Sequence, residues 1–413
     1  MATKVEYIEV NDIKIPVIFE EDKRLPLVTM QFVFQNSGSI TDGKKAGLAK
    51  FSSKVMNDGT KKLGSSAFAE ALEAKAIHIS SSIGKETFVM EVGCLKDEFD
   101  EALGFFDSLL QDPNFSENTI QKIKATTIGS LSAKENDFDY IASNELKSIL
   151  FKDTPLANPT SGTIESVKNI TLDDVKSFIK KHIVSSRLIV LVGGDVNLDD
   201  LKMKLSKIIS KIEVGEFKKV KHYKVVDKAS EVVLLKDTQQ AYIYFGSPYF
   251  MNADAKDYYK ARVATFILGT GGFGSRLMEE IRVKRGLAYS AYARVNVTKS
   301  SSYMSGYLQT KLNSLDEAKS TVKEVFSNFV KDGVTKEELE QTKKFLLGSE
   351  PLRVETMSQR LSRTFQEYYR GFELGHYKDE LKLIKELKLK DLNKFIKEHN
   401  EILDMSFAIV TAK

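Results

Sequence analysis

The feature that most constrains this sequence is an internal repeat. Residues 93–131 read GCLKDEFDEALGFFDSLLQDPNFSENTIQKIKATTIGSL, and residues 306–349 read GYLQTKLNSLDEAKSTVKEVFSNFVKDGVTKEELEQTKKFLLGS. Both predict a strand, a long amphipathic helix that begins near Asp-Glu-Ala, a short break and a second helix that ends near Gly-Ser. LVTMQFVFQNSGS (27–39) has a similar partner in AYIYFGSPYF (241–250). A period of about half the chain indicates a duplicated domain, because solenoid units are only ~20–50 residues long.

The ends of the two copies set the expected domain limits. The first copy closes on RLIVLVGGDVNLDDLKMKLSKII (187–209), a buried strand followed by a helix, and the second closes on a strand at SFAIVTAK. We expect an N-terminal domain at 1–210, a charged linker at 211–228 and a C-terminal domain at 229–413. Strand hairpins mixed with helix pairs predict an α+β fold, with helices packed on a largely antiparallel sheet in each domain.

Composition excludes several classes of protein. A net charge of +4 over 413 residues gives no support for nucleic acid or an anionic membrane as a main partner. The single cysteine, Cys94, excludes a disulfide framework, and its apolar setting VMEVGCL predicts a buried thiol. No segment approaches the ~20 apolar residues of a membrane span. The N-terminus lacks the apolar core of a signal peptide, so we expect a cytoplasmic protein, or a periplasmic one if a leader has been removed.

The histidines form no short metal-ligand pair, because none lies within five residues of another: His78, His182, His222, His376 and His399. His182 and His399 fall near the ends of predicted helices. A cationic ring would interact favourably with the helix dipole there, so we interpret both as structural.

The glycines of GTGGFG (269–274), namely Gly269, Gly271, Gly272 and Gly274, satisfy the G-x-G-x-x-G pattern. A dinucleotide site needs a strand before this pattern, whereas the preceding DYYKARVATFIL has helical spacing. We therefore predict a flexible glycine loop between two helices, which could let a peptide backbone approach closely.

The stretch SRLMEEIRVKRGLAYSAYARV (275–295) begins as a helix, and Gly286 is suited to the position just after its end. Arg282 and Tyr289 lie around that end, seven residues apart. Arg282 could pair with a nearby carboxylate while Tyr289 begins a strand. Alternatively, the guanidinium and the phenol could converge on a peptide carbonyl or a developing oxyanion. The pattern alone leaves both interpretations open.

Two motifs resemble those of a known family. GLAKFSSKVMNDGT (47–60) resembles G-L-A-H-F-L-E-H-M-x-x-x-G-T of the inverted-zincin peptidases, which include pitrilysin, insulin-degrading enzyme, the mitochondrial processing peptidase and short bacterial relatives. SRLMEEIRVKRGLAYSAYA resembles the second-domain signature S-R-L-x-x-x-x-R-x-x-x-G-L-A-Y-S. The similarity covers essentially the whole chain and implies two homologous domains in a clam-shell arrangement.

The resemblance breaks at the catalytic positions. Active members carry H-x-x-E-H, in which two histidines bind zinc and the glutamate is the general base. Here those positions are Lys50, Ser53 and Lys54, and the best match to the third ligand, a glutamate, is Ser130. Protonated lysine has no lone pair to donate, and two ammonium groups would repel a dication. We therefore expect this chain to bind no metal.

The resemblance also implies a function. In family members that work as two chains, one chain carries the zinc motif and the other carries an arginine–tyrosine pair with the spacing of Arg282 and Tyr289. This implies a non-catalytic, substrate-binding subunit of a heterodimeric zinc peptidase, with zinc in the partner, peptides as substrates and a homodimer when isolated.

Two alternatives stay open. The first is a binding or structural protein, like the related core proteins of respiratory complexes. The second is a metal-independent enzyme that uses Lys50 or Lys54 as a base, although the sequence offers no oriented nucleophile for it.

Overall fold

In the computed structural model, which describes residues 3–412, the chain divides into two compact units. The first comprises the residues up to Ser132, Pro159–Val220 and Arg353–Tyr369. The second comprises Ala133–Asn158, Lys221–Leu352 and the residues from Arg370 onward. The domains predicted from the sequence are continuous stretches, whereas each compact unit includes a segment from the other half of the chain, and the predicted linker contributes to both units.

The first unit is built on a six-stranded sheet with the strand order β1-β2-β6-β3-β5-β4. Its strands are β1 (Lys4–Val10), β2 (Ile13–Glu21), β3 (Leu27–Gln35), β4 (His78–Ile83), β5 (Thr87–Leu95) and β6 (Leu188–Gly194). Only β2 and β6 run parallel, and the other neighbours are antiparallel.

The second unit repeats this topology in five strands, in the order β7-β11-β8-β10-β9. They are β7 (Glu231–Leu235), β8 (Gln240–Pro248), β9 (Ala291–Val297), β10 (Ser302–Lys311) and β11 (Ser406–Thr411). The parallel pair, β7 and β11, occupies the same place as β2 and β6, and β8 occupies the place of β3. This arrangement confirms the predicted α+β fold with two homologous domains on largely antiparallel sheets.

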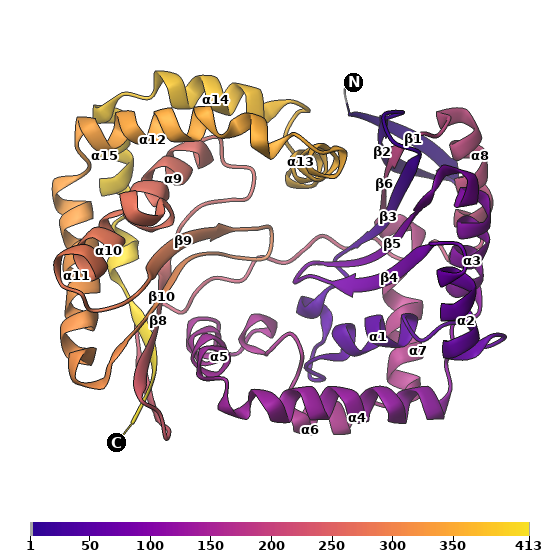
Figure 1. Cartoon of the computed structure of the whole chain (residues 1–413), viewed down its shortest axis with the longest axis horizontal. Coiled ribbons are helices and arrows are strands. Elements are labelled where there is room, and N and C mark those ends of the chain that lie inside the picture. The colour runs from indigo at the N-terminus through magenta and orange to yellow at the C-terminus, as the bar shows by residue number, and fades with distance from the viewer. Residues whose placement is uncertain (1–2, 413) are drawn as a thin grey trace. The chain divides into compact units, whose positions relative to one another are not determined.

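Helices pack mainly on one face of the first sheet (Figure 1). The helices of this unit other than α13 are α1 (Leu48–Met56), α2 (Gly64–Glu73), α3 (Phe99–Gln111), α4 (Glu117–Ala133), α6 (Ile164–Lys168), α7 (Leu172–His182) and α8 (Leu198–Ile209). The rings of Phe32 on β3 and Phe106 on α3 meet edge to face, with their centroids 4.9 Å apart. Cys94 is buried in the same core, as predicted.

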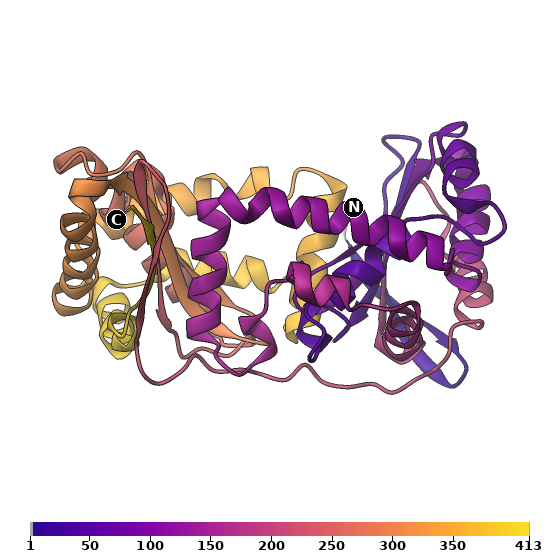
Figure 2. The same ribbon diagram turned by 90° about the horizontal axis from the view of Figure 1, so that it is seen from below.

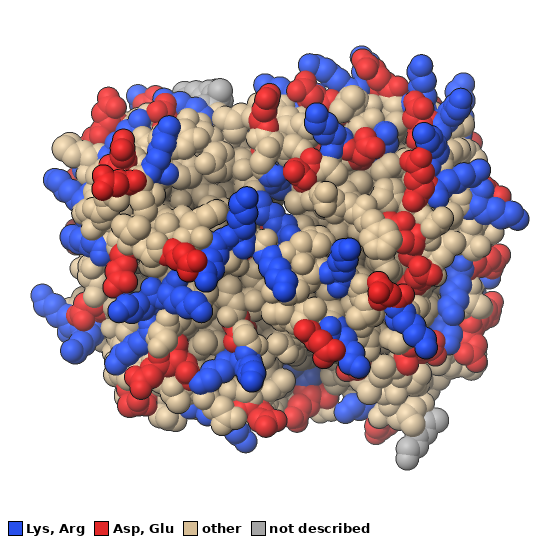
Figure 3. Space-filling view, turned by 180° about the vertical axis from the view of Figure 1, so that it is seen from behind, with Lys and Arg blue, Asp and Glu red and all other residues tan. Residues whose placement is uncertain are grey.

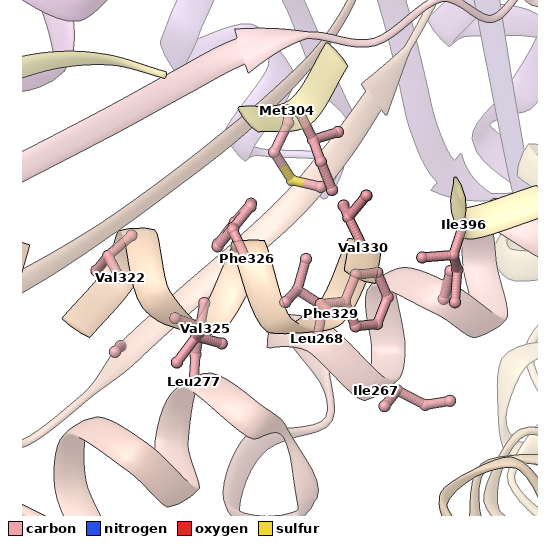
Figure 4. Packing of buried hydrophobic residues seen from close by; sticks show 14 of the residues in the cluster. Ile267, Leu268, Leu277, Met304, Val322, Val325, Phe326, Phe329, Val330 and Ile396 are labelled. Carbon is pink, nitrogen blue, oxygen red and sulfur yellow. The ribbon is translucent and has the colours of Figure 1, made fainter. Parts of the chain in front are cut away.

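The helices of the second unit are α5 (Phe138–Leu150), α9 (Tyr258–Thr265), α10 (Arg276–Met278), α11 (Leu315–Asp332), α12 (Lys336–Gly348), α14 (His376–Glu386) and α15 (Leu389–Glu398). Figure 4 shows Phe326 and Phe329 of α11 in the core, near Met304 of β10 and Leu268. Figures 1 and 2 show α11 and α5 on opposite faces of this sheet.

The charged surface agrees with the small net charge. Acidic and basic side chains are interspersed over the face shown in Figure 3. Among the described residues, no helix combines the length and the apolar character needed to cross a bilayer.

One helix from each half of the sequence packs on the sheet that the other half of the sequence forms. Helix α13 (Met357–Arg370), from the second half, places Leu361 among Ile18, Val33, Ile189 and Leu191 of the first sheet. Helix α5, from the first half, packs on β8 and β11. Asp139 of α5 accepts hydrogen bonds from Tyr244 (3.1 Å) and Gln309 (2.6 Å) of the second sheet.

Each of these two exchanged helices, α13 and α5, packs over a glycine of its sheet. A Cβ atom on Gly193 of β6 would lie 2.6 Å from Leu361 Cδ1 and 2.7 Å from Met357 Sδ of α13. A Cβ atom on Gly246 of β8 would lie 2.7 Å from Leu150 Cδ1 of α5. Because such distances are below van der Waals contact, a side chain at either position would force its neighbours to shift, and at Gly193 these neighbours are the flexible ends of Leu361 and Met357.

A buried ion pair fixes α13 to the first sheet. Arg360 donates to Glu20 Oε1 through Nε (2.8 Å) and Nη2 (2.6 Å), and Nη2 also lies 3.3 Å from Asp22 Oδ2. The Glu20 side chain has no solvent exposure. A carboxylate in this position depends on its partner, since a buried charge without one is very costly.

We predict that Arg360→Met lowers the free energy of unfolding by about 3–5 kcal/mol, because it leaves the Glu20 charge buried without its cationic partner. Chemical denaturation measures this loss. Ser358→Ala, an exposed position on the same helix, is the matched control and should change stability by less than about 0.5 kcal/mol. The double variant Arg360→Met/Glu20→Gln should recover part of the loss. An Arg360→Met chain as stable as the parent would contradict this role.

His182 differs from the expectation of a cationic ring. It lies at the end of α7, stacked on Phe178 with ring centroids 4.5 Å apart, and its Nδ1 accepts from Arg187 Nη1 at 2.9 Å. A guanidinium can only donate, so this ring is neutral. Burial, followed by repulsion from Arg187 and Lys181, lowers the pKa of His182 to about 4. Desolvation therefore outweighs the helix dipole.

A lowered histidine pKa makes stability depend on pH. The contribution of a neutral His182 is fully present above the unfolded-state pKa of ~6.5 and is lost as the pH falls through the folded-state value of about 4. We predict that the free energy of unfolding falls between pH 7 and pH 4.5 by about 2–3 kcal/mol more in the parent chain than in His182→Gln. His78→Gln, at an exposed histidine, should follow the parent. Equal pH slopes for all three chains would contradict this.

Candidate functional site

Helix α1 carries the positions that correspond to the zinc motif. Its N-terminus is held by Asp42, whose carboxylate accepts from the backbone N–H groups of Gly47 and Ala49, both at 2.8 Å. A carboxylate at this position satisfies backbone donors that the helix leaves free. The local sequence therefore builds the predicted helix, and Lys50, Ser53 and Lys54 all lie on it.

The side chains at the motif positions bond to the protein itself. Lys54 Nζ donates to Thr127 Oγ1 of α4 at 2.8 Å, and Ser53 Oγ donates to the carbonyl of Lys50 at 2.9 Å. Partial burial, and then repulsion from Lys50, lower the pKa of Lys54. Ser130 is exposed and donates to the carbonyl of Thr126 in its own helix at 3.0 Å. The structure thus brings Thr127, one turn before Ser130, to Lys54.

This donor set does not suit zinc. Zinc sites in proteins use thiolate, imidazole and carboxylate ligands, and the side chains that meet here end in two amines and two hydroxyls. Among residues 3–412, no three His, Cys, Asp or Glu side chains come together as a possible metal site. The groups at these positions therefore do not form the ligand set of a zinc site.

The free edge of the first sheet is blocked beside α1. Asn57, which follows α1, accepts from the backbone N–H of Ser81 on β4 at 2.6 Å and donates to the carbonyl of Ser81 at 2.9 Å. β4 is an edge strand, so these are groups that an added peptide strand would otherwise use. A peptide can pair at this point only by displacing the Asn57 side chain.

The glycine loop connects two helical segments, as its sequence context predicts. A π-helical turn, Phe266–Thr270, extends α9 and precedes it, and α10 begins at Arg276. Gly269 lies against the backbone of Ala293 on β9. No strand precedes the glycines, so the context that a dinucleotide site requires is missing.

Arg282 and Tyr289 come together. Arg282 lies in a second π-helical segment, Glu279–Lys284, a conformation that is frequent at functional sites. This segment ends at Gly286, whose φ of +62° fits the position predicted for it. Arg282 Nη1 donates to the backbone carbonyl of Tyr289 at 2.8 Å. Its guanidinium carbon lies 4.3 Å from the centroid of the Tyr289 ring.

The aromatic ring of Phe273, from the glycine loop, completes this arrangement at 4.6 Å from the Arg282 guanidinium carbon. Phe273 is 65% exposed and Tyr289 is 82% exposed, which is unusual for large aromatic side chains. The cluster of Phe273, Arg282 and Tyr289 can therefore present cationic donors, a phenol and an aromatic face to a ligand. Arg282 thus contacts two aromatic rings and a backbone carbonyl, which differs from the alternative expectation that it pairs with a carboxylate.

The sequence analysis did not identify three residues of these two sites: Thr127 and Asn57 near the motif helix, and Phe273 in the glycine loop. Thr127 and Asn57 act on segments far away in the sequence, so no local pattern marks them. Phe273 had a usable signal, because it is the one large apolar side chain within the polar glycine loop.

Comparisons with known proteins agree with the repeat and its motifs. Residues 17–164 match the family model described as insulinase (peptidase family M16), and residues 169–346 match the one described as peptidase M16 inactive domain. A relative from Helicobacter pylori, called non-peptidase homolog YmxG, is 43% identical over 412 residues, covering 100% of this chain and 95% of its own.

Solved structures show the same fold. A peptidase M16 inactive domain from Pseudomonas fluorescens superposes with a TM-score of 0.90 at 23% identity, covering 99% of this chain and 98% of its own. A protease from Helicobacter pylori superposes with a TM-score of 0.86 at 18% identity, covering 99% of this chain and 100% of its own.

The contact between Lys54 and Thr127 predicts that position 127 is the place for a third zinc ligand. We expect the variant Lys50→His/Ser53→Glu/Lys54→His/Thr127→Glu to bind one zinc ion per chain. Placing the last glutamate at Ser130 instead should weaken zinc binding by roughly tenfold or more. Position 130 lies on the exposed side of α4, so a glutamate there would not reach the zinc and the ion would lose one ligand. Zinc titration calorimetry on the two variants compares them. Equal affinity, or tighter binding with Ser130→Glu, would contradict the geometry.

Proposed function

Because the chain belongs to the insulinase family of peptidases, peptidase family M16, we propose that it is the non-catalytic, substrate-binding subunit of a two-chain zinc metallopeptidase. One observation carries the proposal: Lys50 and Lys54 replace the metal-binding histidines, while Arg282 and Tyr289 form an ordered and exposed cluster. A chain with no function beyond its fold would have little reason to expose Phe273 and Tyr289 around a cation. The name of the Helicobacter pylori relative, non-peptidase homolog, is consistent with this role.

In the proposed complex, a homologous partner carries H-x-x-E-H and supplies the zinc, the base and the attacking water. This chain supplies Arg282 and Tyr289. The hydrogen bond to the Tyr289 carbonyl fixes Arg282, and its other N–H groups are available to a substrate carbonyl oxygen. The Tyr289 phenol donates to the oxyanion that forms when water adds to that carbonyl. A cytoplasmic location is part of the proposal.

A binding or structural protein without proteolytic function is the second candidate. The observation that favours it is the closed state of the degenerate site, where Lys54 is bonded to Thr127 and Asn57 occupies the edge of β4. A metal-independent enzyme receives less support. Thr127, the hydroxyl nearest to Lys54, is only 4% exposed, so a substrate cannot reach it as a nucleophile.

We predict that adding this chain to a homologous H-x-x-E-H chain stimulates peptide hydrolysis, and that Arg282→Ala lowers kcat of the mixture by about 10²–10³-fold, because one oxyanion donor is typically worth that much. Tyr289→Phe should lower kcat by a similar factor with little change in KM. Fluorogenic peptide hydrolysis measures both.

Lys284→Ala is the matched control, because it removes a cation from the same π-helical segment, where the Lys284 ammonium pairs with Glu280. It should leave kcat within about twofold of the parent mixture, since exposed ion pairs contribute little. If turnover is unchanged by adding this chain, or if Arg282→Ala and Lys284→Ala behave alike, the proposal is wrong and the binding or structural role gains.

A further inference from the structure

A cavity in the second unit lies apart from the cluster of Phe273, Arg282 and Tyr289. Its volume is about 310 Å³. One wall is the segment 222–225, which lies within the charged linker. Another is the segment 248–252, which begins at the last residue of β8. Neither the zinc-motif positions nor the glycine loop lines this cavity.

Hydrogen bonds hold the linker segment 222–225 in place. The backbone N–H of Tyr223 donates to the carbonyl of Ser300 at 2.8 Å, and that of Val226 donates to the carbonyl of Leu150 at 2.9 Å. His222 Nδ1 lies 3.1 Å from the carbonyl of Lys299. Because a carbonyl only accepts, this contact requires the proton on Nδ1, and Nε2 is then left for another partner. These bonds fix the conformation of the segment that lines the cavity.

The interior of the cavity is apolar. Val225, Tyr249 and Met251 are buried and line it, whereas Phe250, which also lines it, is 68% exposed. Glu401 holds this segment, because it accepts from the backbone N–H of Phe250 at 2.8 Å. An exposed phenylalanine beside buried apolar side chains provides a surface on which an apolar group would lose contact with water.

The polar groups at this cavity favour a negative charge. Lys224 and His222 line it, and none of its lining residues is Asp or Glu. By contrast, a cavity of about 460 Å³ in the same unit is lined by four glutamates, Glu279, Glu280, Glu324 and Glu338, together with two cations, Arg276 and Lys284.

From these observations we infer that this cavity, which we call the Tyr249 pocket, binds an apolar group joined to a carboxylate. The apolar group would occupy the space between Val225, Tyr249 and Met251. The carboxylate would lie at Lys224, with His222 Nε2 as a further polar partner. A peptide that ends in a free apolar residue and a free apolar carboxylic acid share this chemistry.

The test uses the full chain and two labelled pentapeptides, Gly-Ser-Gly-Ser-Leu as the free acid and as the C-terminal amide, measured by fluorescence anisotropy. Octanoate serves as a competitor that represents the free apolar acids. Lys224→Glu is the test variant, and Lys221→Glu is its matched control, because Lys221 makes the same charge change in the same segment without lining the pocket. Circular dichroism verifies that both exposed substitutions leave the fold intact.

We expect the free acid to bind at least about tenfold more tightly than the amide, a difference of ~1.4 kcal/mol. Lys224→Glu should weaken the free acid by roughly fivefold or more, and Lys221→Glu should change it by less than about twofold. Octanoate that displaces the peptide, or that binds where the peptide does not, supports the inferred chemistry and identifies the source. Equal binding of acid and amide, equal effects of the two lysine variants, or no binding of any probe at millimolar concentration would overturn the inference. None of these results depends on a peptidase partner.

Discussion

The contact between Arg360 and Glu20 shows the constraint on which this fold depends most: each sheet is completed by a helix from the other half of the chain. Helix α13 covers the first sheet over Gly193, and α5 covers the second over Gly246. Neither half can therefore bury its own sheet on both faces. The duplication evident in the sequence is a repeat of topology, but the two halves of the sequence depend on each other, because each one supplies a helix that packs on the sheet of the other.

Electrostatics distinguish this chain from a zinc enzyme on the same scaffold. At the motif helix, two lysines occupy the positions of neutral imidazoles, and Lys54 is satisfied by a hydroxyl of the neighbouring helix. Ser53 is likewise bonded, to the carbonyl of Lys50 within the same helix. The opposite holds at the Phe273, Arg282 and Tyr289 cluster, where two aromatic rings stay in solvent around a fixed guanidinium. The proposed function therefore assigns substrate binding to this cluster in the second unit.

Sequence patterns predicted most of the fold and part of the candidate site. The repeat predicted the equivalence of β3 and β8, and local spacing predicted α1 and the Gly286 helix end, whereas it left the convergence of Arg282 and Tyr289 as one of two open interpretations. The exchange of α5 and α13 was not predictable, because hydrophobic periodicity shows that a helix has a buried face but does not show which sheet covers it. The neutral state of His182 and the contact of Lys54 with Thr127 depend on residues that only folding brings near, so local rules about helix ends and ligand spacing missed them.

The most direct measurement is zinc content and peptide turnover for the purified chain, alone and in complex with a homologous H-x-x-E-H chain. Elemental analysis after dialysis, native mass spectrometry and hydrolysis of an unstructured peptide belong in one experiment. We expect no bound zinc and no turnover for the chain alone, and one zinc per heterodimer with turnover in the complex. Stoichiometric zinc in the isolated chain, required for cleavage of the peptide, would contradict the central claim.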